Sequence, residues 1–143
     1  MQFELIPYQS DWYFQACQLR NEILRKPLGL DLMTEDLSEE SEYLHYGMVD
    51  CNQVVACALV IPLSEINVKI RQMTVGVEYQ GRGTGKQLLQ NMEIDLKQRG
   101  FTSVELDARV SVLGFYEKLG YSADGDEFVS VSIPHLRMMK SLD

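Results

Sequence analysis

The sequence predicts an α/β (α+β) fold with a mixed, mostly antiparallel central sheet of six to seven strands and helices on both faces. Two apolar runs, residues 45–49 and 53–61, flank Asp50, Cys51 and Asn52, which is typical of an antiparallel hairpin. Residues 67–77 and 103–108 also have strand character, and the helix between them implies a parallel pair. All 143 residues are expected to form one domain, which is long enough for its own core.

Composition excludes several classes of protein. The chain has 21 acidic against 13 basic residues, a net charge of −8, which disfavours nucleic acid as a partner and is compatible with a cationic substrate. The three cysteines have no zinc-ligand spacing and cannot all pair, so we expect free thiols, a reducing compartment and no metal.

No segment suggests export or membrane insertion. The N-terminal residues have no basic lead and no long apolar run. The longest apolar stretch, residues 54–61, is far shorter than the roughly 20 residues that a membrane helix needs. We therefore expect a cytoplasmic protein.

The first elements of the chain are a strand and a helix. Residues 2–6 alternate between apolar and polar and stop at Pro7. Ser10 is a candidate N-cap for a helix with Trp12, Ala16, Leu19 and Ile23 at helical spacing, which ends before Pro27. Arg20 and Arg25 lie outside this apolar stripe, which favours solvated side chains over a role in binding an anionic group.

Residues 28–44 are expected to form a loop and a short irregular helix. Their acidic residues favour a solvated face, and the alternative is an acidic lip that attracts an amine. The acidic residues are Glu35, Asp36, Glu39, Glu40 and Glu42. His45 follows at the start of a strand, where a catalytic role is the less favoured interpretation.

The strand at residues 67–77 contains an irregularity. Val68 and Ile70 occupy even positions, whereas Met73, Val75 and Val77 occupy odd ones. Because side chains in a strand have a period of two, this change of parity predicts a β-bulge near residues 71 and 72. The alternative is a central strand that is apolar on both faces.

A glycine-rich loop and a helix follow that strand. Gly81, Gly83 and Gly85 allow the backbone to approach a ligand with uncovered N–H groups. Helical periodicity begins at Gly85 and ends at Gly100. The free amides at the helix N-terminus and the helix dipole favour an anion there, and Arg82 and Lys86 can add to the site. The pattern predicts a phosphate-binding loop.

Two common phosphate loops do not fit this sequence. The ATP-type loop requires a glycine where Gln80 stands, and a Ser or Thr where Gln87 stands. The dinucleotide fingerprint requires a glycine in place of Leu88. The segment Q-G-R-G-T-G instead matches the pattern Q/R-x-x-G-x-G/A, and here the chain resembles the GNAT superfamily of acetyl-CoA-dependent N-acetyltransferases.

The resemblance extends beyond the loop. Residues 73–75 look like the central strand of that family, and residues 115–121, F-Y-E-K-L-G-Y, look like its second hallmark. Between them, residues 103–108 are the expected parallel strand, and residues 112–119 a short helix capped by Gly120. An asparagine that often precedes this helix in the family is absent, since Arg109 and Ser111 stand there. The C-terminal part is strand-like at residues 128–133, followed by Pro134, His135 and a last segment at 136–139.

The resemblance implies a sheet splayed in the middle and transfer of an acetyl group from acetyl-CoA to a primary amine of a small molecule. It implies that Tyr116 lies beside the sulfur and protonates the departing thiolate. It also implies that the strand residues bind the thioester and the loop residues bind the pyrophosphate. The implied acetyl-CoA-binding residues are Met73, Thr74, Val75, Gln80, Gly81, Arg82, Gly83, Thr84, Gly85 and Lys86.

The sequence leaves several alternatives open. The general base is Asp107, Glu105, His135 or a water molecule. The acceptor, the acyl group and the choice between a monomer and a homodimer are also undecided. Two other functions remain: an acyl-CoA-binding sensor or partner module without turnover, and acetylation of a protein or peptide.

Overall fold

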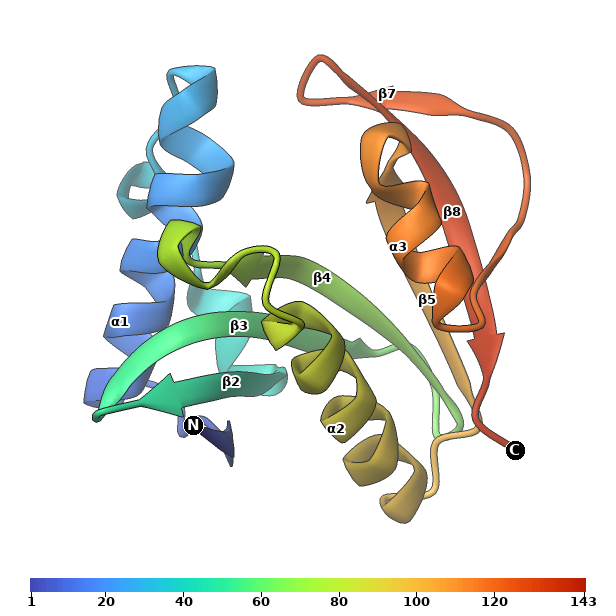
Figure 1. Ribbon diagram of the computed structural model, residues 1–143, viewed down its shortest axis with the longest axis horizontal. Helices are drawn as coiled ribbons and strands as arrows, with labels where there is room; N and C mark the ends of the chain where they lie inside the picture. The colour runs from blue at the N-terminus through green and yellow to red at the C-terminus, as the bar shows by residue number, and fades with distance from the viewer.

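The structure is a computed structural model and describes residues 1–143. The chain forms eight strands and three α-helices, and β2–β4 and β6–β8 each follow one another without an α-helix between them (Figure 1). Their bounds are β1 Gln2–Leu5, α1 Asp11–Arg20, β2 Leu44–Asp50, β3 Gln53–Pro62, β4 Asn67–Val75, α2 Thr84–Gln98, β5 Ser103–Arg109, α3 Leu113–Lys118, β6 Ser122–Ala123, β7 Phe128–Ser130 and β8 Ile133–Ser141. No helix among them is both long enough and apolar enough to span a bilayer.

The sheet has eight strands, which is more than the six to seven predicted. Its order is β1-β2-β3-β4-β5-β8-β6, with β7 also paired to β8, and only β4 and β5 are parallel. The additional strands come from the C-terminal part. The prediction of a single strand at residues 128–133 is wrong, because this segment is divided between β7 and the start of β8. The chain turns there at Val131 and Ser132, whose φ values are +46° and +64°. Because neither residue is Gly or Asn, the usual signal for such a turn is missing.

Helices cover both faces of the sheet. On one face α2 packs Leu88, Leu89, Met92 and Leu96 into the larger core, and α3 lies against the same core. On the other face α1 packs against β3 around a smaller core that contains Tyr13, Ala16, Cys17 and Cys57. Side chains of β3 supply both cores, because successive residues of a strand point to opposite faces.

The sheet opens between its two central strands, as the resemblance implied. β4 and β5 pair only from Asn67↔Ser103 to Ile70↔Leu106. Beyond these residues β4 continues alongside β3, and β5 continues alongside β8. Figure 1 shows the two strands close together near the C-terminus and diverging away from it. The second half of β4 therefore has an edge that no strand covers.

The predicted β-bulge is confirmed. Cys57 pairs with Thr74, whereas Leu59 pairs with Arg71, so that Gln72 and Met73 both lie opposite Ala58. Gln72 has a φ of +54°, which is uncommon for a residue with a side chain. The bulge lies where the two central strands begin to separate.

The first helix differs from the prediction. Ser10 is the N-cap and accepts a hydrogen bond from the Tyr13 amide, as expected. The α-helical part ends at Arg20 and continues as a π-helical turn, Asn21–Arg25. Its buried residues are Tyr13, Ala16, Cys17 and Arg20. Of the predicted stripe, Ala16 is buried, and Trp12 and Leu19 are partly buried against the same core.

Candidate active site

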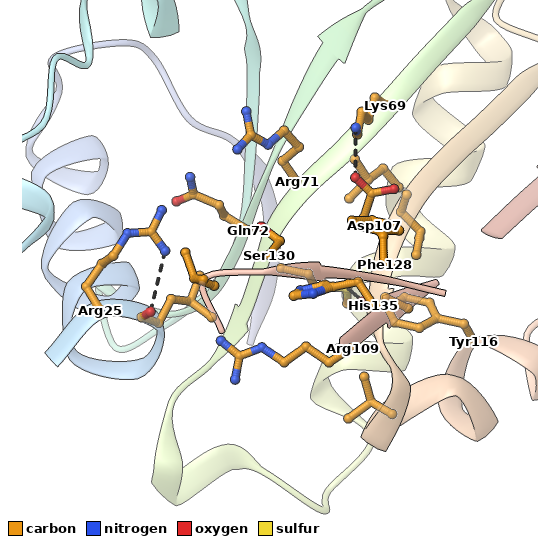
Figure 2. A pocket seen from close by; sticks show the side chains of 17 residues that line it. Arg25, Lys69, Arg71, Gln72, Asp107, Arg109, Tyr116, Phe128, Ser130 and His135 are labelled. Atoms are coloured by element: carbon orange, nitrogen blue, oxygen red, sulfur yellow. Dashed lines mark hydrogen bonds and ion pairs between the residues drawn. The ribbon is translucent and has the colours of Figure 1, made fainter. Parts of the chain in front are cut away.

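A cavity of about 360 Å³ occupies the opening between β4 and β5 (Figure 2). Residues of both strands line it, together with Tyr116 of α3, residues of β7 and β8, and Leu24 and Arg25 beyond α1. Side chains alternate along a strand, and Arg71 and Arg109 lie on the face opposite the core packed by α2 and α3. Tyr116 packs on that core. The cavity lining therefore includes side chains from both faces of the sheet.

The glycine loop presents free backbone donors. The N–H groups of residues 81–86 donate no hydrogen bond within the protein, and no side chain caps α2. Gly81 and Gly83 have φ values of +74° and +79°, and a Cβ at either position would meet no atom within 4 Å. These amides lie at the positive end of the α2 dipole, where residues 81–83 and Lys86 are exposed and Thr84 is buried, and free amides at a helix N-terminus are the arrangement that binds phosphate groups.

The side chains of the loop have different surroundings. Gln80 donates through Nε2 to the carbonyl of Val75 at 2.9 Å, so this side chain fastens the loop to the end of β4. The guanidinium of Arg82 lies 5.7 Å from the centre of the Tyr79 ring. Lys86 and Arg82 form no ion pair, which leaves both charges available to an anion.

The end of β4 connects the loop to the cavity. A Cβ at Gly85 would lie 3.4 Å from Val75 Cγ2 and 3.7 Å from Met73 Cε. The amide of Gly76 donates to Val55 of β3. Because amides alternate along a strand, the amide of Val75 points to the opposite, uncovered edge. That amide is placed to donate to a carbonyl oxygen in the opening. Thr74 is buried on the other side, with its hydroxyl bonded to the carbonyl of Gln72 at 2.8 Å.

Tyr116 lies at the inner end of this path. Its hydroxyl is 3.6 Å from the sulfur of Met73, and its side chain lines the cavity. Burial raises the pKa of Tyr116 to about 12. The phenol therefore stays protonated at neutral pH, as a proton donor must.

His135 is the base candidate with a free nitrogen in the cavity. Its Nδ1 lies 2.7 Å from the carbonyl oxygen of Ile133, and because a carbonyl only accepts, Nδ1 carries the proton. In the neutral ring Nε2 then has the lone pair. The ring stacks on Phe128 with 5.7 Å between centres, which fixes its plane (Figure 2).

The other base candidates are less well placed. Asp107 lines the cavity, but its carboxylate is bound by Lys69 Nζ at 2.9 Å. Glu105 does not line the cavity, and its nearest basic partner is Arg137 at 3.9 Å.

A buried polar network supports the bulge from behind, and the sequence analysis missed it. Arg20 is 2% exposed, which contradicts the expected solvated side chain. It donates two hydrogen bonds to Glu40, at 2.9 and 2.6 Å, and a third to Gln72 Oε1 at 2.7 Å. Tyr13 also donates to Glu40 at 2.8 Å. The network therefore fastens the side chain of the bulge residue to α1.

The acidic segment does not form a lip around the cavity. None of its five carboxylates lines the cavity. Glu40 is buried in the network, and Glu35 binds Arg25 at 2.8 Å. His45 is also buried, with Nε2 bonded to the carbonyl of Glu40 at 2.8 Å, so it belongs to the α1-side core. The only signal in the sequence for the burial of Arg20 is that it lies within one helical turn of Cys17, which is itself buried.

Comparison with known proteins identifies a family. Residues 17–142 match the acetyltransferase (GNAT) domain, which is most of the chain. A protein of Bacillus subtilis (strain 168), named as a candidate acetyltransferase, is 29% identical over 135 residues. That alignment covers 90% of this chain and 88% of the other.

Solved structures share the whole fold. A candidate N-acetyltransferase from Lactobacillus plantarum superposes with a TM-score of 0.88 at 20% identity, over 99% of this chain and 97% of that one. An aminoglycoside 6′-N-acetyltransferase complexed with coenzyme A gives a TM-score of 0.83 at 18% identity, over 100% and 98%. At these identities the likeness concerns the fold alone.

Proposed function

Because the chain belongs to the acetyltransferase (GNAT) family, we propose that it is an N-acetyltransferase that moves an acetyl group from acetyl-CoA to a primary amine of a small molecule. Acetyl-CoA supplies a thioester, whose acyl carbon accepts the amine and whose sulfur departs as a thiolate. Direct attack in a complex that holds both substrates needs no covalent nucleophile on the protein. The residues must therefore bind, orient and move protons.

The glycine loop fits the pyrophosphate of acetyl-CoA. The free amides of residues 81–86 supply the hydrogen bonds, and Arg82 and Lys86 supply positive charge. The open space in front of Gly81 and Gly83 leaves room for the phosphates. The amide of Val75, at the uncovered edge of β4, donates to the thioester carbonyl, and removal of one such donor typically costs about 3 kcal/mol.

Two side chains move the protons. Tyr116 holds its proton at neutral pH and gives it to the thiolate sulfur. His135 accepts a proton from the amine at Nε2, because its other nitrogen is committed to Ile133. The two groups line one cavity, so a single bound pair of substrates can reach both.

The observation that carries the proposal is a short series of contacts from the phosphate-binding loop to the phenol. Met73 Cε lies 3.7 Å from the point at which a Cβ on Gly85 would stand, so the two residues are neighbours. The Met73 sulfur in turn lies 3.6 Å from the hydroxyl of Tyr116. A ligand anchored at the loop can thus follow the open edge of β4 towards Tyr116.

The first test is thermal stabilisation by acetyl-CoA. At about 100 times its Kd, acetyl-CoA should raise the Tm by about 5–10 °C, because a ligand that binds only the folded state stabilises it by about 2.7 kcal/mol. ATP and NAD at the same concentrations should give no shift. An unchanged Tm at millimolar acetyl-CoA would contradict the proposal.

A matched pair of glycine variants locates the binding site. Gly83→Val places a branched side chain in front of the free amides and should abolish the shift. Gly125→Val is the control, because Gly125 also has a positive φ, +87°, and a Cβ there would meet no atom within 4 Å, but it lies between β6 and β7 and not in the glycine loop. Both variants lose stability through backbone strain, and only Gly83→Val should lose the response to acetyl-CoA.

Turnover is measured as release of the CoA thiol with a broad panel of amines. Release in the presence of an amine supports the enzyme. Binding of acetyl-CoA without release for any amine would favour a non-catalytic acyl-CoA-binding module, and release only with peptides would favour a protein acetyltransferase.

A further inference from the structure

The charges around the cavity identify the class of acceptor. Resting on the function proposed above, we infer that the acceptor amine also carries an anionic oxygen group, a carboxylate or a phosphate, bound by the guanidinium group of Arg109, while Arg71 adds positive charge to the same cavity. An amino acid and a phosphorylated amine both have this chemistry.

The cavity has the opposite charge to the protein. The whole chain has 21 acidic and 13 basic residues. The cavity lining has four basic residues, Arg25, Lys69, Arg71 and Arg109, and one acidic residue, Asp107. A site for a purely cationic amine would show the reverse balance, because opposite charges attract across a cavity of low dielectric.

Two of the four basic groups have no partner in the protein. Lys69 is bound to Asp107 at 2.9 Å and Arg25 to Glu35 at 2.8 Å. Arg71 and Arg109 take part in no side-chain hydrogen bond and no ion pair. Every other arginine except Arg82, at the glycine loop, has an acidic partner. The free guanidinium groups therefore gather at the two proposed ligand positions.

Their orientation separates them from the thioester end. In Figure 2 the guanidinium groups of Arg71 and Arg109 are turned away from Tyr116, towards the side on which Arg25 lies. The opening in the sheet thus has the phenol at one end and arginines at the other. An acceptor that enters from the arginine side can direct its amine towards Tyr116 while its anionic group stays beside the arginines.

The position of Arg109 sets the spacing of the two acceptor groups. Arg109 pairs directly with His135 across β5 and β8, so their side chains leave the same face, with Cβ atoms about 5 Å apart. An amine at Nε2 of His135 and an anion at the Arg109 guanidinium are then separated by only a few bonds, as in a small amino acid. The planar fork of an arginine matches both carboxylate and phosphate oxygens.

The experiment compares matched acceptors in the CoA-release assay. Each proteinogenic amino acid and β-alanine is paired with its carboxamide, and O-phosphoethanolamine is paired with ethanolamine. We expect at least one anionic acceptor with a kcat/KM about 10- to 100-fold above that of its neutral partner, the range for a charge-assisted hydrogen bond. The carboxylate and phosphate pairs decide which anion is used.

Variants then connect the preference to the arginines. Arg109→Gln should raise the KM for the anionic acceptor by about 10-fold or more, so that the ratio to the neutral partner collapses, and Arg109→Lys should restore part of it. Arg71→Gln, which removes a charge without a direct bond to the anion, should raise this KM less. The control is Arg137→Gln, an exposed arginine on the same face that binds Asp124 and does not line the cavity. It should behave as the wild type. The Tm and its rise with acetyl-CoA verify that each variant is folded.

A binding measurement avoids dependence on turnover. With CoA bound, the preferred anionic acceptor should raise the Tm of the wild type further, and this increment should disappear in Arg109→Gln. Acetylation of neutral amines equal to or faster than that of their anionic partners would overturn this inference and leave the proposed function intact. Binding of acetyl-CoA with no release for any acceptor would overturn both.

Discussion

Tyr116 and His135 are suited to opposite proton transfers because their surroundings differ. The Tyr116 hydroxyl donates to the sulfur of Met73 at 3.6 Å, and burial raises the pKa of Tyr116 to about 12. His135 has one nitrogen bonded to a backbone carbonyl and the other free. One side chain therefore retains a proton at neutral pH, and the other has a lone pair to receive one.

Tyr116→Phe removes only the hydroxyl and keeps the ring in the core. If the phenol protonates the sulfur, kcat should fall by about 10² or more while the KM for acetyl-CoA changes little. Steady-state and single-turnover CoA release measure both quantities. Tyr8→Phe is the control, because the Tyr8 hydroxyl forms no hydrogen bond and Tyr8 lies outside the cavity. Unchanged turnover in Tyr116→Phe would assign this tyrosine to packing alone.

His135→Asn keeps a donor for the Ile133 carbonyl and removes the basic nitrogen. We expect kcat to fall by about 10²-fold or more, and the residual rate to rise steadily with pH, because the amine must then arrive already neutral. The pH profile of kcat/KM is the measurement. If the variant has the same pH profile and rate as the wild type, His135 is not the base, and water or Asp107 would be the remaining candidate.

At the scale of elements, the bulge in β4 determines the geometry of the site. It redirects the strand where β5 departs, and it places Gln72 in an unfavourable conformation that neighbours must maintain. Arg20 holds the Gln72 side chain, and the Thr74 hydroxyl binds the Gln72 carbonyl. The parity of apolar residues predicts the bulge, but it does not identify these supports, because they come from a helix distant in sequence.

Glu40→Gln tests the support behind the bulge. It leaves the buried Arg20 without a counter-charge and should cost about 3–5 kcal/mol of unfolding free energy. Burial alone would raise the pKa of Glu40, but the bonds from Arg20 outweigh it and leave the pKa below its ordinary value of 4.5. The wild type should therefore keep this stabilisation above pH 4.5 and lose it as the pH falls further.

Denaturant titrations across the acid range measure this effect. The variant should show a shallower loss of stability below pH 4.5 than the wild type. Glu39→Gln is the matched control, because Glu39 is an exposed neighbour that only accepts a bond from Tyr43. An equal cost for the two variants would mean that the network does not stabilise the fold.

At the scale of the whole molecule, the central sheet is incomplete between β4 and β5. The two central strands pair over four residues each and then separate, so each half of the sheet has its own neighbours and the cavity forms between them. Charge is also distributed at this scale. The protein is acidic overall, yet two of its three unpaired arginines, Arg71 and Arg109, line the opening. The net charge alone is compatible with a cationic substrate, whereas the local charge favours an amine that also carries an anionic group.

The sequence by itself determined the features that depend on neighbouring residues. The spacing of apolar residues predicted the β2–β3 hairpin and the bulge in β4, because periodicity is a local property. The glycines at every second position of residues 81–85 predicted the loop with free amides before α2, because backbone freedom is also local. The glycine loop, together with residues 73–75 and 115–121, carried the family resemblance, which the comparison confirmed. Tertiary structure alone decided that Arg20 is buried, that β7 and β8 turn back at Val131, and that His135 faces the cavity with Nε2 free. Each of these depends on partners far along the chain, and the energy of an ion pair or a cross-strand contact has no signature in the spacing of nearby residues.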